Sequence, residues 1–87
     1  MQLQKLLINK NFKNRHKILE TLTSYYLENK HPANLKEDLL LSFKEIQNLT
    51  KLNSIELHSQ LGYLENENEI FHHNIESKKY YGISTLG

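Results

Sequence analysis

Besides Glu56, five side chains that can form hydrogen bonds recur between residues 54 and 63, where a helix would turn most of them away from its apolar side. They are Ser54, His58, Ser59, Gln60 and Tyr63. A glutamine can bind adenine through both atoms of its amide, and a serine can bind a base or a phosphate. The pattern is that of a helix able to contact nucleic acid. The alternative is an ordinary solvated helix surface, because phosphate contacts normally dominate affinity and no Lys or Arg lies in this stretch.

Lysines occur at two other places where they could meet phosphate. Lys78 and Lys79 lie at or near the tip of a predicted hairpin, at the end of the polar break between its two apolar stretches. The alternative there is that the lysines only keep the hairpin soluble. Residues 1–17 hold five basic side chains and no acid, which is a phosphate-binding footprint. That stretch could equally be a solvated arm, or the cationic face of a helix that dimerises through Leu3, Leu6 and Leu7.

Catalytic and metal-binding patterns are absent from the sequence. The chain has no cysteine, no glycine-rich phosphate loop and no serine in a nucleophile-elbow setting. His72 and His73 are adjacent, so on a strand they would point to opposite faces and could not easily share one metal ion. We therefore expect neither an enzyme, nor a cofactor, nor a bound metal.

Length and composition indicate one globular domain. The chain has 87 residues, of which 38% are hydrophobic and 24% charged, with a formal net charge of +1. Its longest apolar run, residues 39–41, is far too short to span a bilayer, and its start does not have the form of a signal peptide. The expected location is the cytoplasm, away from any membrane.

Capping residues and helical spacing predict three main helices. Asn14 is the predicted N-cap of a first helix over residues 15–30, which should end at the segment His31–Asn34 because it contains proline. Ser42 and Glu45 form a capping box before a helix over 43–51, and Asn53 caps another over 54–67. Residues 1–13 are then a basic arm or a short helix, and residues 14–87 are the domain.

After residue 67 the apolar period changes from that of a helix to that of strands. Residues 70–75 and 79–84 are predicted to form a two-stranded hairpin, separated by a polar break at 76–78. Tyr81 and Ile83 share one face of the second strand, and we expect both to point inward with Ile70.

Residues 42–87 resemble the winged helix-turn-helix domains of small bacterial transcriptional regulators of the multiple-antibiotic-resistance and arsenic-repressor types. The matching positions are Leu52, Leu57, Leu61, Leu64, Glu65, Ile70 and the closing segment 80–87. The resemblance implies an α+β fold with three main helices and a two-stranded wing. It also implies that residues 54–67 form the recognition helix.

The expected function is double-stranded DNA binding by a small regulator. Ser54, His58, Ser59, Gln60 and Tyr63 would face the major groove, and Lys78 and Lys79 would touch the backbone from the wing. A homodimer is expected on a palindromic site, with Tyr25, Tyr26 and the N-terminal leucines as interface candidates. The alternative is a protein–protein module that binds a basic partner, because residues 52–77 carry five glutamates and no Lys or Arg.

Overall fold

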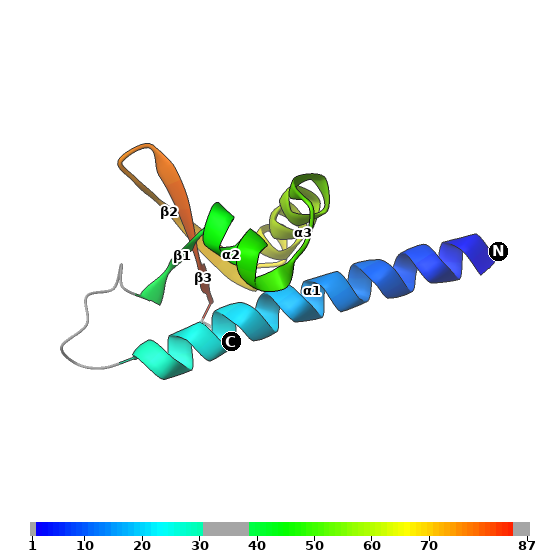
Figure 1. The fold of residues 1–87 in the computed structure, drawn as a ribbon, viewed down its shortest axis with the longest axis horizontal. Coiled ribbons are helices and arrows are strands. Elements are labelled where there is room, and N and C mark those ends of the chain that lie inside the picture. The colour runs from blue at the N-terminus through cyan, green and yellow to red at the C-terminus, as the bar shows by residue number, and fades with distance from the viewer. Residues whose placement is uncertain (1, 31–38, 85–87) are drawn as a thin grey trace.

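The fold is α+β, with three helices and a three-stranded antiparallel sheet in the order β1-β3-β2 (Figure 1). The computed structural model describes residues 2–30 and 39–84, with side chains from residue 10 onward. The elements are α1 (Gln2–Asn29), β1 (Leu41–Ser42), α2 (Phe43–Thr50), α3 (Ser54–Asn66), β2 (Ile70–Ile75) and β3 (Lys78–Ile83). This order is compatible with a winged helix. None of the helices in the described ranges combines the length and apolar character needed to cross a bilayer.

The first helix begins much earlier than its predicted N-cap. Helix α1 runs without a break through residue 14, so the prediction that Asn14 caps it is wrong. Asn14 is only 8% exposed, and its side-chain amide donates a hydrogen bond to Glu56 of α3, at 3.4 Å. A tertiary partner therefore holds this asparagine inside the helix. The N-terminal end of α1 extends beyond the rest of the domain (Figure 1).

Two parts of the prediction for this region lie outside what the structure describes. The side chains of Leu3, Leu6 and Leu7 are outside the described residues, as is the segment 31–34 that was expected to end the first helix. Helix α1 itself ends at Asn29, close to the predicted residue 30.

The second and third helices form where their capping residues predict them. The Ser42 side chain accepts a hydrogen bond from the Glu45 backbone, and the Glu45 carboxylate accepts one from the Ser42 backbone, which completes the capping box. Asn53 accepts from the backbone N–H of Glu56 and caps α3. Between the helices, Lys51 adopts the left-handed conformation that ends α2, with φ 64°. A three-residue connection therefore joins two independently capped helices.

The hairpin is confirmed, but the prediction of a two-stranded sheet is wrong. Strand β1 adds a third strand to the sheet, because Leu41 pairs with Tyr81 on the edge of β3 opposite β2. A two-residue strand before α2 carries almost no periodic signal in the sequence. Strand β3 begins one residue early, at Lys78, since a tight turn of Glu76 and Ser77 with φ 50° and 69° suffices to reverse the chain.

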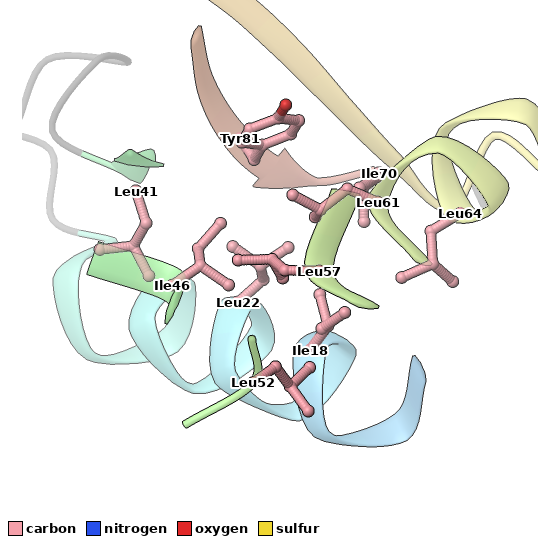
Figure 2. Packing of buried hydrophobic residues seen from close by; sticks show 10 residues of the cluster. All are labelled: Ile18, Leu22, Leu41, Ile46, Leu52, Leu57, Leu61, Leu64, Ile70 and Tyr81. Atoms are coloured by element: carbon pink, nitrogen blue, oxygen red, sulfur yellow. The ribbon is translucent and has the colours of Figure 1, made fainter. Parts of the chain in front are cut away.

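The hydrophobic core lies where α1, α2, α3 and the sheet meet (Figure 2). As predicted, Ile70 and Tyr81 are buried in it, and the partly buried Ile83 packs against it. The cluster consists of Ile18, Leu22, Leu41, Ile46, Leu52, Leu57, Leu61, Leu64, Ile70 and Tyr81. Because every element contributes to this one core, it fixes α3 and the hairpin relative to each other.

Two glycines allow a direct test of this packing. A Cβ at Gly82 would lie 2.5 Å from Leu40 Cδ2 and 2.9 Å from Phe71 Cζ, whereas a Cβ at Gly62 would meet nothing within 4 Å. We expect Gly82→Ala to lower the free energy of unfolding by about 1–3 kcal/mol through overpacking. Gly62→Ala should raise it by about 0.5–1 kcal/mol, because alanine is the better residue within a helix. Urea unfolding of both variants measures this, and a destabilised Gly62→Ala would contradict the open position of Gly62.

Candidate functional site

The solvent-facing side of α3 carries small polar residues, a histidine and an exposed isoleucine, and it has no net charge. Ser54, His58 and Ser59 are exposed there, in agreement with their predicted placement, and Ile55 is 80% exposed. The Leu57, Leu61 and Leu64 side chains point the other way, into the core. This division follows from the 3.6-residue helical period, which leaves one continuous strip of α3 free to contact another molecule.

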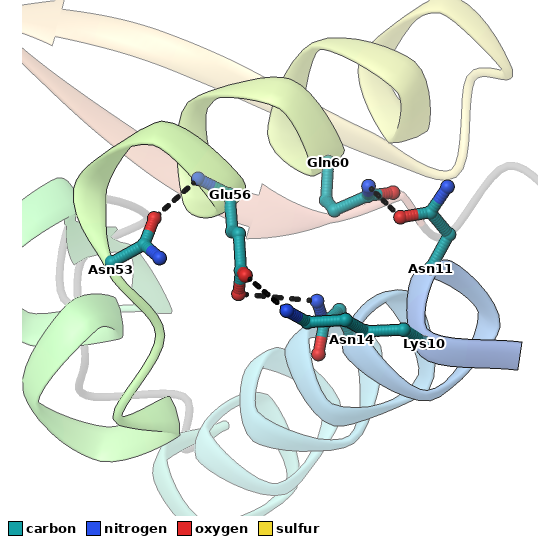
Figure 3. Close-up of polar contacts among 6 residues, drawn as sticks. All are labelled: Lys10, Asn11, Asn14, Asn53, Glu56 and Gln60. Atoms are coloured by element: carbon teal, nitrogen blue, oxygen red, sulfur yellow. Dashed lines mark hydrogen bonds and ion pairs between the residues drawn. The ribbon is translucent and has the colours of Figure 1, made fainter. Parts of the chain in front are cut away.

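Gln60 does not belong to this exposed strip, although the sequence predicts it as a base-reading residue near its edge. It is 5% exposed and lies between α3 and α1. Its side-chain oxygen accepts a 2.7 Å hydrogen bond from Arg15 Nε. Figure 3 shows the other contact, in which its amide nitrogen donates to Asn11 Oδ1 at 3.2 Å. Both ends of the amide are therefore engaged within the molecule, and Gln60 is corrected to a structural residue of the α1–α3 contact.

Tyr63 lies at the border of the exposed strip and is in contact with α1. It is 42% exposed, and the Arg15 guanidinium lies over its ring at 3.6 Å from the centroid. Such a cation–π contact is worth about 0.5–2 kcal/mol. It places a permanent positive charge beside a helix that has no Lys or Arg of its own.

The acid in the first turn of α3 is paired with α1. Glu56 forms a 2.8 Å ion pair with Lys10 and accepts the hydrogen bond from Asn14 (Figure 3). The hydrogen bond from Lys10 holds the pKa of the Glu56 carboxyl below its ordinary value, so it is ionised at neutral pH. Its charge is therefore offset by an ammonium group on the side of α3 that faces α1.

The acid near the end of α3 is paired with the sheet. The Glu65 carboxylate contacts His72 Nδ1 on β2. Next to them, burial raises the pKa of the Tyr81 hydroxyl, and the Glu65 charge raises it further. Of the five glutamates in residues 52–77, the remaining three are exposed in the turns that follow α3 and β2, namely Glu67, Glu69 and Glu76.

Histidines do not assemble a metal site in the described part of the chain. His72 contacts Glu65, whereas its neighbour His73 packs its ring edge-on against Phe71. In residues 10–30 and 39–84, no three side chains of His, Cys, Asp or Glu come together in a way that could hold a metal ion.

A cleft of about 460 Å³ brings three of the predicted contact residues together. It lies between the start of α2, α3 and the start of β3, and His58, Lys78 and Lys79 line it. Lys44 of α2 also lines it, and the ring of His58 stacks on that of Phe43 with centroids 4.3 Å apart. The fold thus joins the hairpin lysines to the exposed side of α3.

Comparisons with known proteins add no evidence on the function of this site. No protein-family model, no curated protein and no solved structure matches the chain.

The predicted dimer candidates are only partly exposed. Tyr25 and Tyr26 are half-buried, and Tyr25 packs against the chain's own core. Tyr25 also lines a second cleft between α1 and α2. Of the two tyrosines, Tyr26 is therefore the more available for contact with a second copy of the chain.

Sequence reasoning missed the polar residues through which α1 contacts α3. Stepping back from Leu22 and Ile18 by four residues leads to Asn14 and then to Lys10, so both lie on the same side of α1 as the core. Polar residues that continue an apolar stripe in this way are a readable signal of a tertiary partner. Lys44 was missed for a different reason, because only the folded sheet brings it near the hairpin.

Proposed function

We propose that this chain is a winged helix-turn-helix domain that binds double-stranded DNA. Helix α3 would enter the major groove, and the β2–β3 hairpin would be the wing that contacts the backbone. The element order supports this, since two capped helices with a short turn precede a hairpin that packs on the same core.

The observation that carries the proposal is the placement of charge around α3. Glu56 is paired with Lys10, and Glu65 contacts His72, so each carboxylate of α3 has a partner within the molecule. Exposed lysines flank that side at Lys44, Lys78 and Lys79. An uncharged helix side next to exposed lysines suits DNA binding. Contacts from the helix to the bases would specify the sequence, and contacts from the lysines to phosphates would supply affinity.

The proposed DNA-contacting residues are therefore fewer than the sequence predicts. Ser54, His58 and Ser59 are proposed to face the groove, with Tyr63 at the border, and Lys78 and Lys79 to contact the backbone. Gln60 is left out, because its amide is bound to α1. One domain covers few base pairs, so a dimer on a palindromic site completes the proposal.

A module that binds a basic protein is the second candidate. The exposed glutamates Glu67, Glu69 and Glu76 favour it, and they lie in the turns that follow α3 and β2. Its partner would be repelled by Lys78 and Lys79, whereas DNA would be attracted by them.

A charge introduced on α3 tests the proposed DNA face. We expect Ser59→Glu to weaken binding to a duplex about tenfold or more, because a carboxylate would lie against the bases and phosphates. The matched control is Ser24→Glu, which adds the same charge at an exposed position of α1. Fluorescence anisotropy with a labelled duplex measures both. Equal losses in the two variants would show that only net charge matters and would refute α3 as the contact helix.

A further inference from the structure

The cleft between α2 and the hairpin has the charge of an anion-binding site. Lys44 comes from α2, and Lys78 and Lys79 come from β3, more than thirty residues later in the chain. None of the described residues that line the cleft is acidic. Like charges brought together by folding raise the free energy of the folded state, and a bound anion removes that cost.

A solvent-accessible hydroxyl group on a largely buried residue of the cleft is a second observation. Tyr81 lines the cleft and is only 6% exposed. Its hydroxyl points away from the hydrophobic cluster in Figure 2 and makes no hydrogen bond to the described residues. Because no described polar side-chain atom is both buried and without a partner, this hydroxyl is open to solvent and can donate to a ligand. Because burial raises its pKa, the group stays protonated at neutral pH and is available as a donor.

Three glutamates of the described chain belong to elements next to the cleft but do not line it. Glu65, whose charge acts on Tyr81, is in contact with His72. Glu45 accepts the hydrogen bond of the capping box and lines the other cleft, between α1 and α2. Glu76 lies exposed in the hairpin turn. The cleft therefore presents ammonium groups and a neutral donor on its own surface.

We propose that this cleft binds a phosphate group, with Lys44, Lys78 and Lys79 supplying charge and the Tyr81 hydroxyl donating a hydrogen bond. The cleft's size lies within the range of small-ligand sites, so it has room for the group that carries the phosphate. That group is either the backbone of DNA or a small phosphorylated compound. The inference rests on the proposed function only if the bound phosphate belongs to DNA.

Nuclear magnetic resonance of the full chain with inorganic phosphate tests the cleft itself. At constant ionic strength, phosphate should shift the amide signals of Lys44, His58 and Tyr81 and saturate, whereas chloride should not. Lys44→Ala should weaken phosphate binding about tenfold, and Tyr81→Phe about threefold to tenfold, because each removes one donor. The matched control is Lys17→Ala, an exposed lysine that lines the other cleft. Tyr81→Phe keeps the ring, so its unfolding midpoint verifies that the fold is intact.

Two further titrations identify the source of the phosphate. If it belongs to DNA, inorganic phosphate should compete with a duplex, and Lys44→Ala should lower the salt slope of DNA binding by about one. If it belongs to a small compound, pyrophosphate should bind more tightly than phosphate, and Lys44→Ala should leave DNA affinity unchanged.

The two proposals fail in different ways. Saturable phosphate binding in a protein that does not bind DNA would refute the proposed function and support the cleft. Non-saturating shifts spread over every exposed lysine, or Lys44→Ala and Tyr81→Phe variants that bind phosphate like the wild type, would overturn the cleft whatever the DNA result.

Discussion

Replacing Leu61 with alanine is expected to lower the free energy of unfolding by about 2–5 kcal/mol. Leu61 is 2% exposed on α3 and belongs to the cluster that joins α3 to the other helices and the sheet (Figure 2). Truncation removes its apolar contacts and leaves a cavity that close-packed neighbours cannot fill. Chemical denaturation followed by circular dichroism measures the change.

The same helix supplies a matched control for this prediction. Ile55 is an aliphatic residue of similar size on the opposite side of α3, where it is mostly exposed. Ile55→Ala should therefore change the free energy of unfolding by less than about 0.5 kcal/mol. Equal losses in the two variants would contradict the orientation of α3, and with it the exposed side on which the DNA proposal depends.

Removing both hairpin lysines is expected to make DNA binding less dependent on salt. No lysine or arginine lies on α3, so the phosphate contacts must come from elements around it. We expect about three to five phosphates to be neutralised in the wild type. Lys78→Ala/Lys79→Ala should then reduce the slope of log affinity against log salt concentration by about two.

Two other lysines provide the control for the salt titration. Lys17 is exposed on α1 and Lys30 is exposed directly after its end, and both lie outside the cleft that Lys78 and Lys79 line. Lys17→Ala/Lys30→Ala removes the same net charge and should leave the slope within about half a unit of the wild type. If both double variants changed the slope equally, the hairpin would have no special place in the interface.

Local signals were sufficient to predict most of the fold. Ser42, Glu45 and Asn53 satisfy backbone groups within three residues of themselves, so their helices begin where expected. Strand β2 was predicted at residues 70–75 because alternating apolar residues and flanking turns are also local features.

The errors in the fold came from tertiary contacts that override local preference. Asn14 has the chemistry of a helix cap, but Glu56 bonds its amide from forty-two residues away and keeps it inside α1. Strand β1 exists because Leu41 and Ser42 pair with β3, and an isolated two-residue strand has no pattern to detect. Neither partner can be identified from spacing along the chain.

The candidate site was predictable only in part, because helical period is a local signal but the contacts between helices are not. Helical period placed Ser54, His58 and Ser59 on exposed sides of α3. It left Gln60 at the boundary, and only the position of Arg15 and Asn11 on α1 decides that Gln60 is buried. The acidic composition of residues 52–77 also did not reveal that Lys10, on α1, offsets the charge of Glu56.

Titration of the wild-type chain into a labelled mixed-sequence duplex at low salt tests the central claim, that this domain binds double-stranded DNA through α3 and the hairpin. Fluorescence anisotropy should show saturable binding in the micromolar range or tighter, which weakens steeply as salt is added, because phosphate contacts supply most of the non-specific affinity. A folded protein that shows no binding at tens of micromolar under these conditions would contradict the account.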